Sequence, residues 1–177
     1  MEPLLHFVIL FTALIILGIK FRKAFTASLI ALIPDLDVLF HVHRSISHSA
    51  IPAIIVSLLL LYTFKKHRRL IVLALIAYLS HLFLDIFCGY TPILYPIYGK
   101  NIWISVELNS HISSFIGLGL NFKILTKPVE FKVFESLDAL LFTSEGVASS
   151  IILLSSILIS KLTKWLHKPS LKPFRKD

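Results

Sequence analysis

The chain has 177 residues, of which 56% are hydrophobic, and its mean hydropathy is +0.82. These values exclude an ordinary soluble domain, and the length indicates one domain, expected to be membrane-embedded and to cover residues 1–177. The net charge of +8 does not indicate nucleic-acid binding, because the basic residues gather beside apolar runs, at residues 20–23, 65–69 and 161–176. Such clusters are typical of the cytoplasmic flanks of membrane spans.

Five apolar runs follow one another, at residues 4–19, 25–33, 50–64, 70–88 and 147–159. A helix needs about 20 residues to cross a bilayer, and roughly 17 as a lower limit, so several runs must include their polar flanks. Glu2 precedes the first run and basic residues follow it, the reverse of a secretory signal peptide. We expect an all-α multi-pass membrane helical bundle of four or five spans, depending on whether residues 25–40 cross, with a cytoplasmic C-terminus.

Candidate metal ligands lie within or beside the first four runs. They are His6, Asp35, Asp37, His48, His81 and Asp85, with His43 as a further candidate. Counting about 1.5 Å per helical residue from the nearest basic cluster places the six at heights of roughly 18–25 Å. This is the outer half of a membrane whose hydrocarbon core is about 30 Å thick. Ionisable groups at such depth are costly and usually functional, so we expect them to meet toward the extracytoplasmic face.

Two of these pairs also have plainer interpretations. His81 and Asp85 are four residues apart and share one helix face, where they can bind a divalent metal or simply hydrogen-bond each other. Asp35 and Asp37 would diverge on an unbroken helix, but a break at Pro34 would let both carboxylates converge on one ion. The alternative is that these two carboxylates cap backbone amides at a helix end.

The segment HVHRSISHS provides the expected catalytic residues, His43 and Arg44. The planar guanidinium of Arg44 suits an anionic oxygen of a substrate. The alternative is an interfacial loop whose Arg and His side chains meet lipid head groups. Three aspartates in this layer and one arginine leave a charge of about −2, which a low-dielectric environment disfavours and a divalent cation would neutralise.

Residues 90–146 read as an extracytoplasmic insertion of mixed structure. Alternating apolar residues predict short strands at 102–108 and 129–134, with Lys127-Pro128 as a turn between them. The end of the chain, from Lys161, predicts a basic cytoplasmic tail.

The ordered set of motifs resembles the membrane-bound metal-dependent hydrolases of the inner membrane. That family has an early His in the first span, then PD-x-D, HR-x-x-x-HS, and H-x-x-x-D followed by a Gly and a Leu-x-Pro stretch. The corresponding residues are His6, Pro34-Asp35-Leu36-Asp37, His43-Arg44, His48-Ser49, His81 with Asp85, Gly89 and Leu94-Tyr95-Pro96. The resemblance covers residues 1–98. The family is in turn distantly similar to zinc-dependent phospholipase C and to P1-type nucleases, which implies His and Asp ligands around zinc.

We therefore expect a metal-dependent hydrolase that acts on a phosphoester of a lipid or lipid-linked substrate, with membrane lipids as its surroundings. The expected cofactor is one or two divalent cations, zinc first, with manganese or magnesium as alternatives. Two other functions stay open. A metal or proton transporter would place its site nearer the membrane midplane. A non-catalytic membrane protein would hold a structural metal with closed coordination.

Overall fold

A computed structural model of the chain describes residues 2–42, 44–112, 116–133 and 142–166. Within these residues the chain is mostly helical and carries one small antiparallel sheet. The elements in order are α1 (Pro3–Ile16), α2 (Phe21–Ile30), the 3-10 helices η1 (Pro34–Phe40) and η2 (Ile46–His48), α3 (Ala50–Thr63), the 3-10 helix η3 (Lys65–His67), α4 (Arg68–Cys88), β1 (Lys100–Ile112), β2 (Ile116–Pro128) and α5 (Ser144–Leu166). His43 lies outside the described residues.

One described helical stretch, Lys65–Cys88, is long and apolar enough to cross a membrane by length and composition. It joins η3 to α4 and has 24 residues. The apolar helices Pro3–Ile16, Ala50–Thr63 and Ser144–Ser160 are shorter. The expected span at residues 25–40 is not one helix, because α2 ends at Ile30 and Pro34, which has no N–H to continue an α-helix, begins η1. Helix length thus supports one span and not the expected four or five.

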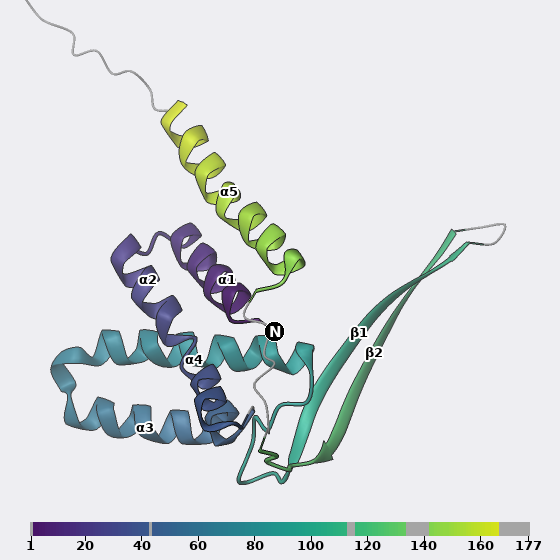
Figure 1. The fold of residues 1–177 in the computed structure, drawn as a ribbon. Coiled ribbons are helices and arrows are strands. Elements are labelled where there is room, and N and C mark those ends of the chain that lie inside the picture. The colour runs from purple at the N-terminus through teal and green to yellow at the C-terminus, as the bar shows by residue number, and fades with distance from the viewer. Residues whose placement is uncertain (1, 43, 113–115, 134–141, 167–177) are drawn as a thin grey trace, which may run out of the picture.

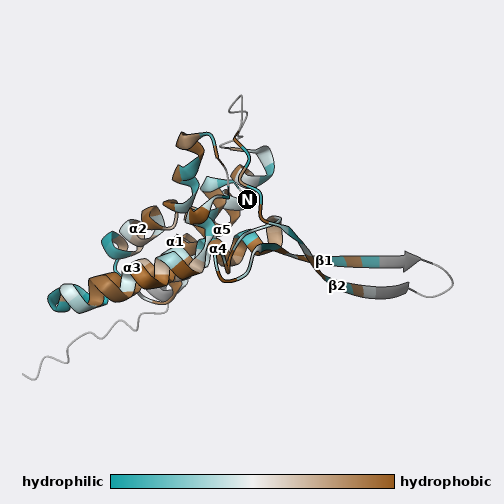
Figure 2. Cartoon of the chain, turned by 90° about the horizontal axis from the view of Figure 1, so that it is seen from below, coloured by the Kyte–Doolittle hydropathy of each residue, from teal (hydrophilic) through white to brown (hydrophobic). Residues whose placement is uncertain are grey.

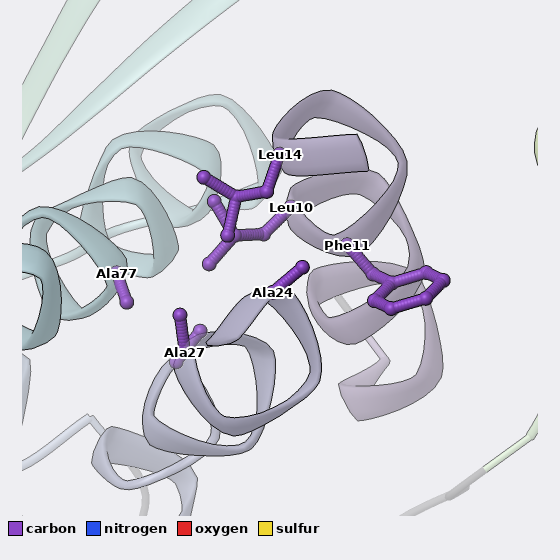
Figure 3. Packing of buried hydrophobic residues seen from close by; sticks show 7 residues of the cluster. Leu10, Phe11, Leu14, Ala24, Ala27 and Ala77 are labelled. Atoms are coloured by element: carbon purple, nitrogen blue, oxygen red, sulfur yellow. The ribbon is translucent and has the colours of Figure 1, made fainter. Parts of the chain in front are cut away.

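The hydrophobic core joins α1, α2 and α4 (Figure 3). Leucines and a phenylalanine on α1 meet alanines on the two other helices. The labelled members are Leu10, Phe11, Leu14, Ala24, Ala27 and Ala77. Small side chains allow helix backbones to approach closely, so the alanines let α1, α2 and α4 pack closely against one another. This packing fixes the positions from which α1 and α4 present their polar residues.

Helices α3 and α4 lie side by side as an antiparallel pair, connected through η3, while α1, α2 and α5 are inclined to them (Figure 1). The outer side of α3 is apolar along its length, as the brown ribbon in Figure 2 shows. Ile55, Leu58 and Leu59 expose more than half of their surface, and Ile151 and Ile152 on α5 do the same. A large exposed apolar surface of this kind is typical of contact with lipid.

Strands β1 and β2 form a long hairpin that projects away from the helices (Figure 1). Its paired residues run from Lys100 opposite Pro128 to Ile112 opposite Ile116. Two backbone hydrogen bonds connect the base of the hairpin to the segment after α4. Thr91 N donates to Ile102 O at 3.0 Å, and Ile102 N donates to Thr91 O at 2.9 Å.

The hairpin corrects the prediction for residues 90–146. The strand expected at 102–108 lies inside β1, but the second strand is Ile116–Pro128 and not 129–134. Lys127 and Pro128 are not a turn, because they pair with Asn101 and Lys100 at the base of the hairpin. The actual connection comprises residues 113–115, which lie outside the described residues.

Candidate metal centre

The structure brings together polar side chains from four separate segments. His6 comes from α1, Asp35 from η1, His48 from η2, and His81 with Asp85 from α4. The two α4 residues are four apart, so they emerge from the same side of that helix. His6, His48, His81 and Asp85 expose 1% of their surface or less. The side chain of Asp35 is 12% exposed and is the least buried of the set.

These residues form two groups that share His81. The first is His6, His81 and Asp85, and the second is Asp35, His48 and His81. In the first group His6 Nε2 lies 3.3 Å from Asp85 Oδ1, and His81 Nε2 lies 3.7 Å from Asp85 Oδ2. In the second group Asp35 Oδ1 lies 3.6 Å from His48 Nε2 and 3.4 Å from His81 Nε2. The groups are also linked directly, since His48 Nε2 lies 3.4 Å from Asp85 Oδ2.

These separations fit donors around a cation. Two donors bound to one zinc ion at about 2.0–2.1 Å, at the tetrahedral angle, lie about 3.3 Å apart. Most of the measured nitrogen–oxygen separations, between 3.3 and 3.7 Å, fall close to that value. They are longer than good N–H···O hydrogen bonds, whose lengths run from about 2.7 to 3.2 Å. The side chains are thus placed around common points and not locked onto one another.

Several buried polar atoms of the centre make no hydrogen bond to any described residue. They are both ring nitrogens of His6, both ring nitrogens of His81, and Asp35 Oδ2. Buried polar atoms are almost always hydrogen-bonded, so each exception requires an explanation. A bound cation would satisfy the nitrogens that face the carboxylates. The rings of His6 and His81 also stack, with centroids 3.8 Å apart, which holds both imidazoles in place.

Asp37, a predicted ligand, lies in neither group. Its Oδ2 accepts a hydrogen bond from Ser45 N at 2.8 Å and one from Ser47 Oγ at 2.9 Å. The same oxygen lies 3.1 Å from His48 Nδ1. A ligating histidine usually makes such a contact with a carboxylate through its second nitrogen, which fixes the ring orientation. The structure therefore places Asp37 behind His48, with His48 Nε2 facing the centre.

Arg44, which we expected to be catalytic, lies at the edge of the centre. Its Nε is 3.7 Å from Asp85 Oδ2, and its Nη1 donates a hydrogen bond to Tyr90 O at 3.1 Å. The backbone of Arg44 is left-handed, with φ of 58°, a strained conformation for this residue type. Gly89 makes room for the guanidinium, because a Cβ at position 89 would lie 2.4 Å from Arg44 Nη1.

Two further polar residues support the centre, Ser47, for which the sequence indicates at most a helix-capping role, and Tyr78, which no sequence motif marks. Ser47 contacts Asp37, and its Oγ also donates a hydrogen bond to Pro34 O at 3.1 Å, which ties η2 to η1. Tyr78 on α4 donates a hydrogen bond from its hydroxyl to Ser47 O. His81 follows one turn further along α4. The contact therefore connects η2 to the helix that carries His81, the residue shared by both groups. A serine or tyrosine of this kind is recognisable only once its partners are placed.

Charge also favours a cation here. Asp35, Asp37 and Asp85 are close together, and Arg44 is the nearby cation among the described residues. Burying a net negative charge is expensive unless opposite charge accompanies it. A divalent cation held by imidazole and carboxylate donors would supply that charge. The arrangement can therefore hold a metal next to a guanidinium, a group suited to an anionic oxygen.

Comparison with known proteins gives a family for this chain. No curated protein and no solved structure is detectably similar to it. The profile of one protein family, described as YdjM inner membrane protein, matches residues 1–165. The match covers all the segments that build the centre. The chain accordingly belongs to the YdjM inner membrane protein family and is a membrane protein.

Proposed function

We propose that this membrane protein is a metal-dependent hydrolase that cleaves a phosphoester in a lipid or lipid-linked substrate. The observation that carries the proposal is the pair of buried donor groups, His6/His81/Asp85 and Asp35/His48/His81, that share one imidazole. Three imidazoles and two carboxylates form a mixed nitrogen and oxygen donor set. Such a set favours zinc over magnesium, which prefers oxygen donors alone, and manganese is the alternative.

The residues around the centre divide the chemistry. A divalent cation in such a site supplies Lewis acidity, which makes water acidic enough to ionise near neutral pH and polarises the scissile group. Asp37 orients His48 from behind. Arg44 presents its guanidinium beside Asp85, where it stabilises the negative charge that develops on a phosphoester oxygen.

An apolar groove supports the lipid character of the substrate. It has a volume of about 560 Å³ and lies between α2, α3 and α4. Its lining is almost entirely apolar, and Ser47 and Tyr78 are its polar members next to the centre. On α4, Ala74 and Tyr78 line the groove, and His81 and Asp85 follow on the same helix face. We propose that a hydrocarbon chain of the substrate occupies this groove, with its ester group at the centre.

The membrane arrangement is part of the proposal. The exposed apolar surfaces of α3 and α5 are too extensive for water, so we infer that these shorter helices enter the bilayer together with Lys65–Cys88. This makes the chain multi-pass. The basic residues at 65–69 then face the cytoplasm, and the metal centre opens toward the other side. Residues 90–146 form the extracytoplasmic insertion.

The experiment that tests this function combines elemental analysis with a turnover screen. Purified protein is analysed for bound metal and incubated with phosphoester lipids, with and without chelator. We expect bound zinc, and release of a phosphorylated or dephosphorylated product that stops with chelator. His81→Ala and Asp85→Ala should each lower turnover more than about 100-fold. Substitution of residues that only support metal ligands already lowers metal affinity or activity about 10- to 100-fold.

His67→Ala is the matched control, because His67 is exposed in η3 at the other end of α4. It should keep both metal and turnover. Metal binding without turnover on any phosphoester lipid would contradict the hydrolase and favour a structural centre. Ion flux in reconstituted vesicles without hydrolysis would favour transport.

A further inference from the structure

A second, polar pocket adjoins the centre at the opposite end from the apolar groove. It has a volume of about 390 Å³ and lies between the C-terminal end of α4 and the base of the hairpin. Its lining includes Arg44, Tyr90, Asn101, Trp103, Lys127 and Glu130. Three of these come from the hairpin strands, which otherwise project away from the helices. The base of the hairpin therefore forms one wall of a pocket beside the metal centre.

The hairpin wall is held in a fixed geometry. Lys127 Nζ lies 4.4 Å from the centroid of the Tyr90 ring, and Tyr90 packs edge-on against Trp103 with centroids 5.3 Å apart. Asn101 pairs with Lys127 across the two strands and is 7% exposed, and its Nδ2 donates a hydrogen bond to Pro128 O. An ammonium group over an aromatic face is attracted to it. Lys127 is thus directed into the pocket and held there.

Arg44 lies between the pocket and the metal centre. Its Nε is close to Asp85, whereas its Nη1 bonds to Tyr90 O in the pocket wall. The pocket lining holds two cations, Arg44 and Lys127, and one acid, Glu130. Glu130 is itself paired with Lys132, whose Nζ is 3.4 Å from Glu130 Oε2. Counted over the pocket lining alone, without Asp85 beside Arg44, the charge is positive, and guanidinium and ammonium are the groups that proteins use to bind phosphate oxygens.

We propose that this pocket binds the anionic phosphate-bearing head group of the substrate, with Lys127 and Arg44 as its two recognition cations. The inference rests on the proposed function and assigns a role to the hairpin. Along α4 and the two residues after it, the order is then apolar groove at residues 70–78, metal centre at His81 and Asp85, and anion pocket at residues 88–90. A substrate with a hydrocarbon chain and an anionic head matches that order, and its ester group lies between the two.

A binding measurement that needs no turnover tests the pocket. The sequence has two tryptophans, so Trp165→Phe leaves Trp103, a pocket residue, as the sole tryptophan reporter. Full-length protein in detergent is titrated with inorganic phosphate, and separately with micelles containing phosphatidate or phosphatidylcholine. Chelator is present throughout, so that no divalent cation contributes to the signal. We expect the emission of Trp103 to change with phosphate and, at lower concentration, with phosphatidate, but not with phosphatidylcholine.

Substitutions in the hairpin give the decisive comparison. Lys127→Ala should weaken phosphate binding about tenfold, as expected for loss of one hydrogen bond to a charged group. Lys123→Ala is the matched control, because Lys123 is on the same strand and face. It lies further from the base of the hairpin and forms an ion pair with Glu107. It should bind like the parent. Glu130→Gln removes the opposing charge and should strengthen binding, a change that misfolding cannot produce.

Equal phosphate affinities in Lys127→Ala and Lys123→Ala, or no response of Trp103 to any anion, would overturn the proposal. Phosphatidate binding no tighter than inorganic phosphate would overturn the assignment to a lipid head group. These outcomes are separable from the hydrolase itself. If anions bind as described but no lipid is cleaved, the pocket stands and the hydrolase falls. If lipids are cleaved but Lys127→Ala does not change phosphate binding, the hydrolase is supported and the anion pocket is not.

Discussion

At the scale of single residues, the candidate centre consists of side chains that could bind a cation and side chains that hold them in place. The spacing of His81 and Asp85, one helical turn apart, predicted that these two side chains share a face of α4, as they do. The sequence also predicted Asp37 as a ligand, but Ser45 N and Ser47 Oγ turn that carboxylate toward His48 Nδ1. Those contacts depend on the path of the loop between η1 and η2, which spacing does not determine.

The first prediction concerns Asp37 and its contact with His48. Asp37→Asn keeps the shape of the side chain but removes its charge, so His48 Nδ1 loses its charged acceptor. We expect zinc affinity to fall about 10- to 100-fold, measured by competition with a calibrated chelator. Ser80→Ala is the control, since the Ser80 hydroxyl donates to Ala77 O of its own helix beside His81. A parent-like affinity in Asp37→Asn would show that this carboxylate does not support the centre.

Gly89 makes the second prediction at this scale. Gly89→Ala would place a methyl group 2.4 Å from Arg44 Nη1 and displace the guanidinium. We expect kcat/KM for a phosphoester lipid to drop about 100-fold, as for loss of an oriented charge-stabilising donor, with metal content unchanged. Gly99→Ala is the comparison, because a Cβ there meets nothing within 4 Å. Loss of metal in Gly89→Ala, or equal kcat/KM in the two variants, would contradict this explanation.

At the scale of elements, α4 carries His81 and Asp85 and lines both the apolar groove and the polar pocket. The hairpin is the element that differs most from the prediction. The alternation in residues 102–108 indicated a strand correctly, but β1 begins two residues earlier and ends four residues later, at Lys100–Ile112. A two-residue turn at Lys127-Pro128 has the right composition, yet register is decided by cross-strand pairing. The pairing places Asn101 opposite Lys127, at the base of the hairpin and not at a turn. Local residue types therefore indicated a hairpin without locating it.

The groove between α2, α3 and α4 yields the element-scale prediction. Ala74→Phe places a ring where the hydrocarbon chain is proposed to lie. Each methylene excluded from apolar contact costs about 0.8 kcal/mol, so loss of two raises KM for a long-chain lipid about tenfold. KM for a water-soluble short-chain ester should not change. Ile76→Phe is the control because Ile76 is exposed on α4, 52% by surface. An equal rise in KM for both esters would argue against a hydrocarbon site.

At the scale of the whole molecule, hydropathy indicated the environment correctly, since the chain belongs to an inner membrane protein family. It did not determine the number of spans. Apolar composition marks α1, α3 and α5 as clearly as α4, but helix length depends on where backbone hydrogen bonding stops, as at Pro34.

The single cysteine of the chain allows a direct test of orientation. Cys88 is exposed at the end of α4, on the side proposed to be extracytoplasmic. We expect an impermeant maleimide to label Cys88 in intact spheroplasts. In a Cys88→Ser background, Lys66→Cys at the opposite end of α4 should react only after permeabilisation. The reverse pattern would invert the chain and place the metal centre on the cytoplasmic side.

The sharing of His81 by both donor groups has a consequence for stoichiometry. The same atom, Nε2, approaches Asp35 in one group and Asp85 in the other, at 3.4 and 3.7 Å. A ring nitrogen has one lone pair and can donate it to one ion at a time. The two positions are therefore mutually exclusive through this atom, and an ion that moved from the first to the second would exchange His6 and Asp85 for His48 and Asp35. A zinc titration should accordingly reach its high-affinity plateau at a single equivalent, and a second ion would bind without the imidazole of His81.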